Sequence, residues 1–469
     1  MIPKPVNYAV WPGVIPAETV SEMTIIPAER AFLFPEGECY SVWLTAVYGD
    51  DDNYYDLPRK TSKLLQAQAR GGVLTVTCPF GAEGEYSLTL EKDGTTLQEL
   101  RVYALREDLY RLRALKGDLH SHSYRSDGKR DPAAVAGYYR ELGYDFEALT
   151  DHNRYYPGGE IDEVYAGLKM GYTRVPGEEI HAPTSVVHIV HVGGKSSVAD
   201  LYVHDRETYE REAEEYMGKV PANIPERYHE RYAKAMWATD KIHAAGGIAI
   251  FPHPYWIPKG ICNVCDEFAA ILLKSGMFDA FELMGAGGIE AANRSVALWT
   301  QLLSEGVKFP VVGSSDSHEA GMLRNFTVCF AQENESDAIM AAVKAGRCVA
   351  VEADPTGTHD EYNYRCYGDL RLVAYARFLL REYFPRRQRI CQSEGVTMRQ
   401  YAMGEADGAL VEALAKQSAD FSDRFFGRKA PVLPAKAVLD FEDKWRQVQR
   451  NGPMTKGSKA FADKVNRQI

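Results

Sequence analysis

Hydrophobic and polar residues alternate with a period of two in the first part of the chain. Residues 40–47 and 84–90 show this alternation, which is typical of strands buried on one face. Asp93-Gly94 then supplies a hairpin turn. The pattern predicts an all-β, sandwich-like domain over residues 1–110. This stretch contains no histidine, so we expect it to serve packing or homo-oligomerisation rather than metal chemistry.

The pattern changes at about residue 113, where short apolar strands begin to alternate with amphipathic helices. This alternation is typical of an α/β unit. Asp131 and Pro132 predict the start of one helix, and Gly143 predicts its end. Later strands are expected at residues 144–149, 185–192, 248–251, 278–283 and 309–312. A polar helical segment at 200–220 is longer than a connection needs, which makes it a candidate lid.

After residue 352 the sequence becomes helical, with amphipathic patterns at 370–384 and 397–417. The chain is therefore predicted to be a multidomain α/β protein. Its expected parts are the all-β domain at 1–110, an α/β unit at 113–352 and a helical C-terminal region at 353–469.

Histidines and carboxylates recur at the ends of the expected strands. His120 and His122 lie two residues apart, so both rings project from one face of a strand. Two converging neutral imidazoles suit a transition metal such as zinc, manganese or iron. Further candidates follow at or near later strand ends: Asp127, His152, Glu178 or Glu179, His188 or His191, His253, Asp316 and His318. Strand ends of a parallel barrel meet at one edge, so a single site for several metals is predicted.

Two neighbouring pairs need a choice. Glu178 and Glu179 point to opposite sides of an extended strand, so only one of them is expected to bind metal. His188 and His191 lie on opposite faces of a regular strand, and we take His188 as the ligand. His191 is then a packed or supporting residue. His181 has no motif around it and is expected to be solvated or packed.

Composition narrows the classes of protein to consider. The chain has 469 residues and a net charge of −11, which argues against a broad nucleic-acid surface. No apolar run approaches the roughly 20 residues needed to span a bilayer, and the first residues lack a signal pattern. These features predict a cytoplasmic protein without a membrane segment. The eight cysteines include only one C-x-x-C, at Cys262 and Cys265, so reduced thiols are expected.

Residues 116 to about 351 resemble the PHP (polymerase and histidinol phosphatase) domain. The resemblance rests on ordered motifs: His-x-His at 120–122, Ser-Asp-Gly at 126–128, Thr-Asp-His at 150–152, Gly-x-Glu-Ile at 177–180, His-Ile-Val at 188–190, His-Pro at 253–254 and Ser-Asp-x-His at 315–318. It implies a distorted (β/α)7-type barrel with two or three divalent metal ions, zinc, manganese or iron.

The resemblance also implies a ligand set. His120, His122, Glu179 and Asp316 would hold a first metal, and Glu179 would bridge to a second metal with His188 and His253. Asp127, His152 and His318 would hold the third metal of a trinuclear site. Some relatives have histidine where this chain has Asp127. The residues assigned to catalysis are Glu179, Asp316 and His318. We expect Asp118 and Asp151 to orient ligand histidines.

The predicted activity is that of a PHP-family hydrolase, a phosphoesterase of class EC 3.1. A hydroxide that bridges the metals would cleave a small phosphorylated metabolite or nucleotide. Arg154 and Arg294 are the candidate contacts to this anionic substrate, and either residue is equally well read as a surface arginine in an ion pair. Two alternatives remain open, a metal-dependent carboxyl or carbamate ester hydrolase and a non-catalytic metal-binding protein.

Overall fold

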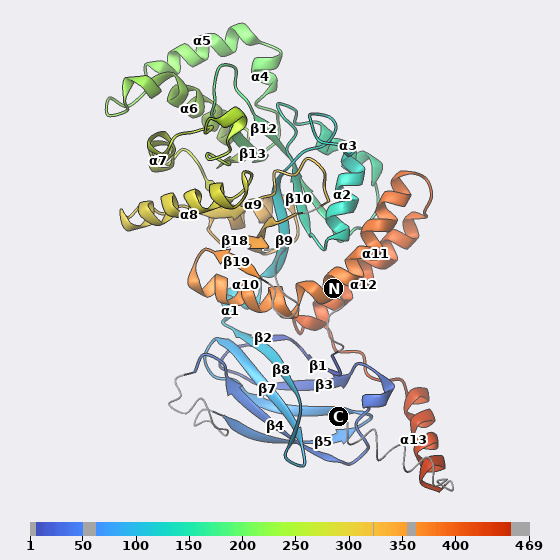
Figure 1. Cartoon of the computed structure of the whole chain (residues 1–469). Coiled ribbons are helices and arrows are strands. Elements are labelled where there is room, and N and C mark those ends of the chain that lie inside the picture. The colour runs from blue at the N-terminus through green and yellow to red at the C-terminus, as the bar shows by residue number, and fades with distance from the viewer. Residues whose placement is uncertain (1–5, 50–61, 322, 354–362, 452–469) are drawn as a thin grey trace. The chain divides into compact units, whose positions relative to one another are not determined.

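The computed structural model describes residues 6–49, 62–321, 323–353 and 363–451 (Figure 1). The chain divides into two compact units. Residues 1–104 and 424–469 form the first unit, and residues 105–423 form the second. The second unit is therefore inserted in sequence between the two parts of the first.

The first unit is built on eight strands. They are β1 (Tyr8–Trp11), β2 (Val14–Pro16), β3 (Val20–Pro27), β4 (Cys39–Ala46), β5 (Lys63–Arg70), β6 (Val73–Pro79), β7 (Gly84–Lys92) and β8 (Thr95–Leu105). Their order in the sheet is β1-β3-β6-β5-β4-β7-β8-β2, and the pairs from β1 to β8 are antiparallel.

Alternation along these strands buries one side of each, as β4 shows with Tyr40, Val42 and Leu44. The turn between β7 and β8 has Asp93 at φ 50° and Gly94 at φ 77°, which suits the predicted hairpin. The all-β character is thus confirmed, and the sandwich-like arrangement stays a prediction.

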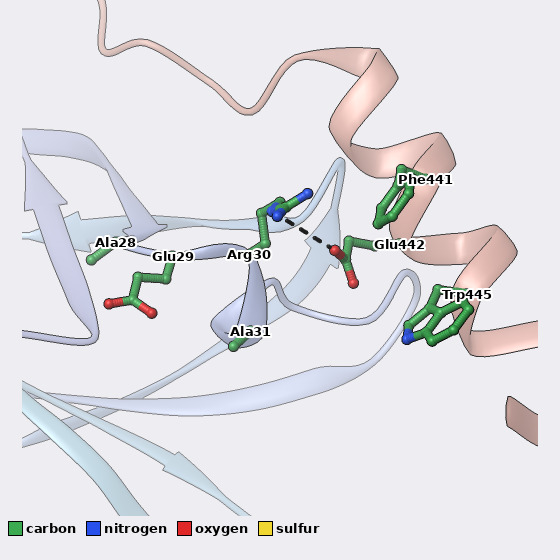
Figure 2. A pocket seen from close by; sticks show the side chains of 7 residues that line it. All are labelled: Ala28, Glu29, Arg30, Ala31, Phe441, Glu442 and Trp445. Carbon is green, nitrogen blue, oxygen red and sulfur yellow. Dashed lines mark ion pairs between the residues drawn. The ribbon is translucent and has the colours of Figure 1, made fainter.

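Helix α13 (Lys436–Asn451) belongs to the same unit and lies beside the short 3-10 helix η1 (Arg30–Phe32). Arg446 donates a hydrogen bond to the carbonyl of Leu33 at 3.1 Å. A cavity of about 750 Å³ lies between the two helices. Figure 2 shows its lining side chains, with Phe441 and Trp445 on the side of α13. Arg30 Nε lies 4.0 Å from Glu442 Oε1 there. No lining residue of this cavity is a histidine or cysteine, so we assign it no chemistry.

Two sheets form the centre of the second unit. The six-stranded sheet has the order β11-β10-β9-β17-β18-β19 and the five-stranded sheet the order β12-β13-β14-β15-β16. The strands are β9 (Arg113–Ser121), β10 (Phe146–Leu149), β11 (Thr173–Val175), β12 (Gly177–Ile180), β13 (Ile189–Gly193), β14 (Gly247–Phe251), β15 (Ala280–Met284), β16 (Val311–Gly313), β17 (Asn325–Ala331), β18 (Cys348–Ala353) and β19 (Tyr364–Tyr367). Isolated bridges from Ser121 to Ser317 and from His152 to Glu179 join the two sheets near their strand ends.

Strand β13 departs from the expected parallel pattern. It pairs antiparallel with both β12 and β14, and it begins at Ile189 rather than at residue 185. Residues 181–188 are too few for the crossover that a parallel strand requires, so the chain turns back. His188 therefore reaches the carboxyl edge of the sheet from the start of its strand, not from the end.

Helices flank these sheets (Figure 1). They are α1 (Glu107–Tyr110), α2 (Pro132–Glu141), α3 (Pro157–Val164), α4 (Asp200–Val203), α5 (Arg206–Met217), α6 (His229–Ala244), α7 (Asp266–Lys274), α8 (Gly288–Ser304), α9 (Ser336–Lys344), α10 (Leu370–Glu382), α11 (Phe384–Ala402) and α12 (Gly408–Phe425). The predicted start of α2 is confirmed, because the Asp131 carboxylate accepts a hydrogen bond from the Ala134 N–H at 3.0 Å. Gly143 follows the helix at φ 82°.

Helix α11 packs against α2 at very close range. A Cβ on Gly395 would come within 2.4 Å of the Gly137 carbonyl oxygen, so only glycine fits there. The guanidinium of Arg140 is fully buried and donates to Glu394 at 2.7 Å. Helices α10 and α11 thus belong to the same compact unit as the two sheets, whereas α13 belongs to the first unit, and the three-part division stays a prediction.

Candidate metal centre

The carboxyl edges of the two sheets gather the histidines and carboxylates of the second unit. His120 is the last residue but one of β9, and Glu179 is the last residue but one of β12. His253 follows β14, and Asp316 follows β16. His253 and Asp316 have backbone φ angles of 23° and 51°, and residues other than glycine rarely adopt positive φ angles. The chain thus turns sharply where these two residues leave their strands.

The Glu179 carboxylate lies at the middle of this cluster. Three imidazole nitrogens lie near its Oε2 atom: His120 Nε2 at 3.3 Å, His122 Nε2 at 3.4 Å and His152 Nδ1 at 2.8 Å. Three others lie near Oε1: His181 Nε2 at 3.3 Å, His188 Nδ1 at 2.9 Å and His253 Nε2 at 3.1 Å. Glu179 is itself buried, so six rings from different elements converge on one carboxylate.

Two further carboxylates complete the cluster. Asp316 Oδ1 lies 3.3 Å from His120 Nε2 and 2.9 Å from His122 Nε2. Asp127 bridges the other side, with one oxygen 3.3 Å from His152 Nε2 and the other 3.2 Å from His318 Nε2. The nine predicted ligands thus lie in groups whose donor atoms are close enough to share a metal ion.

The donor set fits divalent metal ions. His120 Nε2, His188 Nδ1 and Glu179 Oε2 are buried and have no hydrogen-bond partner among the described residues. The two nitrogens nevertheless lie 3.3 Å and 2.9 Å from oxygens of the Glu179 carboxylate. Buried polar atoms are normally paired. Neutral imidazole nitrogens and carboxylate oxygens are the ligands that zinc, manganese and iron take in proteins.

The electrostatics of the cluster favour a bound cation. Burial lowers the pKa of His188 to about 4, against the opposing effect of Glu179, so this ring is neutral near neutral pH. Burial would raise the pKa of Glu179, but the neighbouring imidazoles, His120 first, hold it well below its usual value. Burial lowers the pKa of His120, yet Asp316 and Glu179 prevail and raise it. Ionised carboxylates thus attract a proton or a metal ion to the same place.

Asp118 and Asp151 do not act as expected. Asp118 accepts hydrogen bonds from the backbone N–H of His120 at 3.2 Å and of Ser315 at 3.0 Å, and Asp151 accepts one from the Ser123 N–H at 2.8 Å. Asp118 lies two residues before His120, about 7 Å closer to the start of the strand, so its carboxylate contacts backbone N–H groups rather than the imidazole ring. Neither aspartate bonds to an imidazole within the described part of the chain. Both hold together the main chain that carries the ligands.

Glu282, which was not among the predicted site residues, orients a ligand instead. Its Oε2 lies 2.9 Å from His120 Nδ1, and both side chains are fully buried. Its Oε1 accepts a hydrogen bond from the backbone N–H of His253 at 3.3 Å. Such a carboxylate fixes the tautomer of a ligand histidine. The available signal was a single carboxylate inside the apolar strand β15.

His181 was also missed. We expected it to be solvated or packed, but its Nε2 faces Glu179 and its ring lies 3.7 Å from the His188 ring and 4.2 Å from the His152 ring, centroid to centroid. His191 lies away from the cluster and pairs with Glu178 at 3.0 Å.

The two arginines that were predicted to bind substrate lie outside the cluster. Arg154 is exposed two residues after His152. Arg294 pairs with Asp266 at 2.8 Å and lies over the Tyr255 ring. A cleft of about 240 Å³ beside Asp316 offers another cation, Arg324. It is lined by Gly285, Ala286, Gly287, Gly288, Ile289, Ser315, Arg324, Asn325 and Glu352.

Among the described residues, no helix is long and apolar enough to span a membrane. The eight cysteines carry free thiols.

Comparison with known proteins gives a family match and distant structural neighbours. The PHP-associated family model matches residues 303–348, a stretch that includes Asp316 and His318. One solved structure is a two-domain protein from Bacteroides vulgatus containing a predicted PHP-like metal-dependent phosphoesterase. It is 18% identical, with 55% of this chain and 77% of that chain covered and a TM-score of 0.36. Another is an amidohydrolase from Chromobacterium violaceum with bound sulfate and no metal. It is 17% identical, with 43% and 87% covered and a TM-score of 0.31. No curated protein matches.

Proposed function

We propose that this chain, whose residues 303–348 match the PHP-associated family model, is a metal-dependent phosphoesterase acting on a small phosphorylated metabolite or nucleotide. The observation that carries the proposal is the convergence of six imidazole nitrogens on the two oxygens of Glu179. The distorted (β/α)7 barrel and the trinuclear site are part of the same proposal.

The proposed ligand set follows the three donor groups. His120, His122, Glu179 and Asp316 would hold one ion, Glu179, His188 and His253 a second, and Asp127, His152 and His318 a third. Divalent ions held in this way lower the pKa of a coordinated water and offset the charge of a phosphate.

The proposed ligands differ in how far their side chains are exposed to solvent. His120 and Glu179 are shielded from water, so their positions are fixed and their interactions are strong. The side chains of Asp127 and His318 are 54% and 36% exposed. A substrate would therefore approach from the side of Asp127 and His318. Arg154, on the loop after His152, is the proposed contact for the phosphate. Arg324, which lines the cleft next to Ser315, is a second positively charged residue that could contact it.

The test pairs metal content with two generic substrates, an aryl phosphate and an aryl ester. We expect two or three metal ions per chain and cleavage of the phosphate, with both lost in His120→Ala. His204→Ala is the matched control, because the His204 ring is 73% exposed and pairs only with Asp200 among the described residues. Unchanged turnover in metal-free protein would contradict the proposal.

Two other outcomes point to the alternatives. Cleavage of the ester alone would identify a carboxyl or carbamate ester hydrolase, since the same ligand set can act on a carbonyl group. Full metal occupancy without either activity would identify a non-catalytic metal-binding protein.

A further inference from the structure

His181 occupies a position that none of the family motifs explains. It follows the last residue of β12, and its backbone N–H donates to Asn153 Oδ1 at 2.8 Å. The Asn153 N–H in turn donates to the Glu179 carbonyl at 2.8 Å. The loop that carries His152 and the strand end that carries Glu179 and His181 are therefore fixed to each other by the main chain and side chain of Asn153.

The ring of His181 points into the metal centre. Its Nε2 lies 3.3 Å from Glu179 Oε1, and this nitrogen is buried without a hydrogen-bond partner among the described residues. His152 Nδ1 and Glu179 Oε2 are likewise buried and unpartnered. Donor atoms of His152, Glu179 and His181 all lie within 4.8 Å of one another, close enough to share an ion.

Hydrogen bonding alone does not account for this arrangement. A carboxylate offers about four lone-pair positions, whereas six ring nitrogens surround the carboxylate of Glu179. If all six rings directed an N–H toward Glu179, six donors would compete for these four positions, and at least two of them would find no acceptor on this carboxylate. Neutral rings with lone pairs directed at shared cations avoid this imbalance.

We propose that His181 is an additional metal ligand, whose Nε2 holds a divalent cation together with Glu179 and the Nδ1 atom of His152. A neutral imidazole has one lone pair, so His152 then serves this ion, and the third ion keeps Asp127 and His318. The inference rests on the proposed metal centre and adds a donor to it. A transition metal is the class of ion that two imidazoles and one carboxylate would select. Because His181 stacks on His188, the ring is also held in place from its other face.

The test is a cobalt titration of metal-free protein, with metal per chain and affinity read from the visible spectrum and from competition with a chelator. For both His181→Ala and His181→Gln we expect one ion fewer per chain, or at least tenfold weaker binding of one ion. The side chain is 29% exposed, so neither change leaves a closed cavity. Glutamine keeps most of the packing, so equal loss in the two variants separates ligation from packing.

Wild type, His120→Ala and the control His204→Ala are titrated in parallel. If wild type and both His181 variants bind the same number of ions with the same affinity, while His120→Ala loses metal, the assignment of His181 is wrong and the metal centre stands. If wild type binds no metal, the proposed function and the inference fail together.

Discussion

Glu282 contacts two of the proposed metal ligands without being a ligand itself. Its carboxylate accepts from His120 Nδ1 at 2.9 Å and from the His253 backbone at 3.3 Å, so one side chain holds two ligand-bearing segments. Because Glu282 accepts a hydrogen bond from the Nδ1–H of His120, the lone pair of this ring lies on Nε2 and points at Glu179 and Asp316. Removing the carboxylate should therefore weaken metal binding without removing any ligand.

The magnitude follows from burial. Loss of a carboxylate that orients a ligand histidine costs about 10- to 100-fold in metal affinity, or about 1.4–2.7 kcal/mol. Glu282→Ala should lie at the upper end, because it leaves a fully buried ring N–H without a partner. Glu282→Gln should lie at the lower end, since its amide oxygen can still accept one hydrogen bond.

The assay is competition between the metal-free variants and a chelator of known affinity, with circular dichroism to check the fold. Glu305→Gln is the matched control, because Glu305 is a surface residue paired with Lys274. Metal affinity equal to wild type in a folded Glu282→Ala protein would refute the positioning role.

Three other predictions follow from the second unit. Gly285→Ala should lower metal affinity in the same assay, because the added Cβ would lie 1.9 Å from Glu282 Oε1 and displace it. Arg140→Ala should lower the free energy of unfolding in urea by about 3–5 kcal/mol, since it leaves the buried Glu394 carboxylate unpaired. Burial raises the pKa of Glu147 to about 7, above its unfolded value. Its contribution to stability is thus present below about pH 4.5 and lost as the pH rises through 7. In Glu147→Gln, the difference in unfolding free energy between pH 5 and pH 8 should shrink by about 3 kcal/mol.

Each prediction has a control or a contrary outcome. Gly159→Ala should leave metal affinity unchanged, because nothing lies within 4 Å of the added Cβ. Arg206→Ala removes an exposed ion pair and should change stability by less than about 1 kcal/mol. An identical pH profile in wild type and Glu147→Gln would show that the buried carboxyl does not titrate in this range.

Much of the site was predictable because its ligands carry local patterns. The two-residue spacing of His120 and His122 puts both rings on one face, and the structure brings them to the same carboxylate. Glu282 and His181 gave no such pattern. Their roles depend on contacts with residues far away in the sequence, which only the folded chain brings together.

The direction of β13 was predictable in principle. The short segment 181–188 cannot hold a crossover, and that limit on chain length, rather than the apolar pattern, decides the pairing. The contact of α11 with α2 was not predictable, because it depends on Gly395 and Gly137 facing each other across two separate helices.

The first unit is made of residues 1–104 and 424–469, so its two segments are synthesised at different times. Ribosomes add about 5–20 residues per second, so residues 105–423 take on the order of 15–60 s to emerge. During this interval β1 to β8 exist without α13, and the main chain at Leu33 lacks its bond from Arg446. All residues of the second unit are synthesised before the last residues of the first unit. The hydrogen bond between Arg446 and Leu33 can therefore form only after the whole second unit has been synthesised.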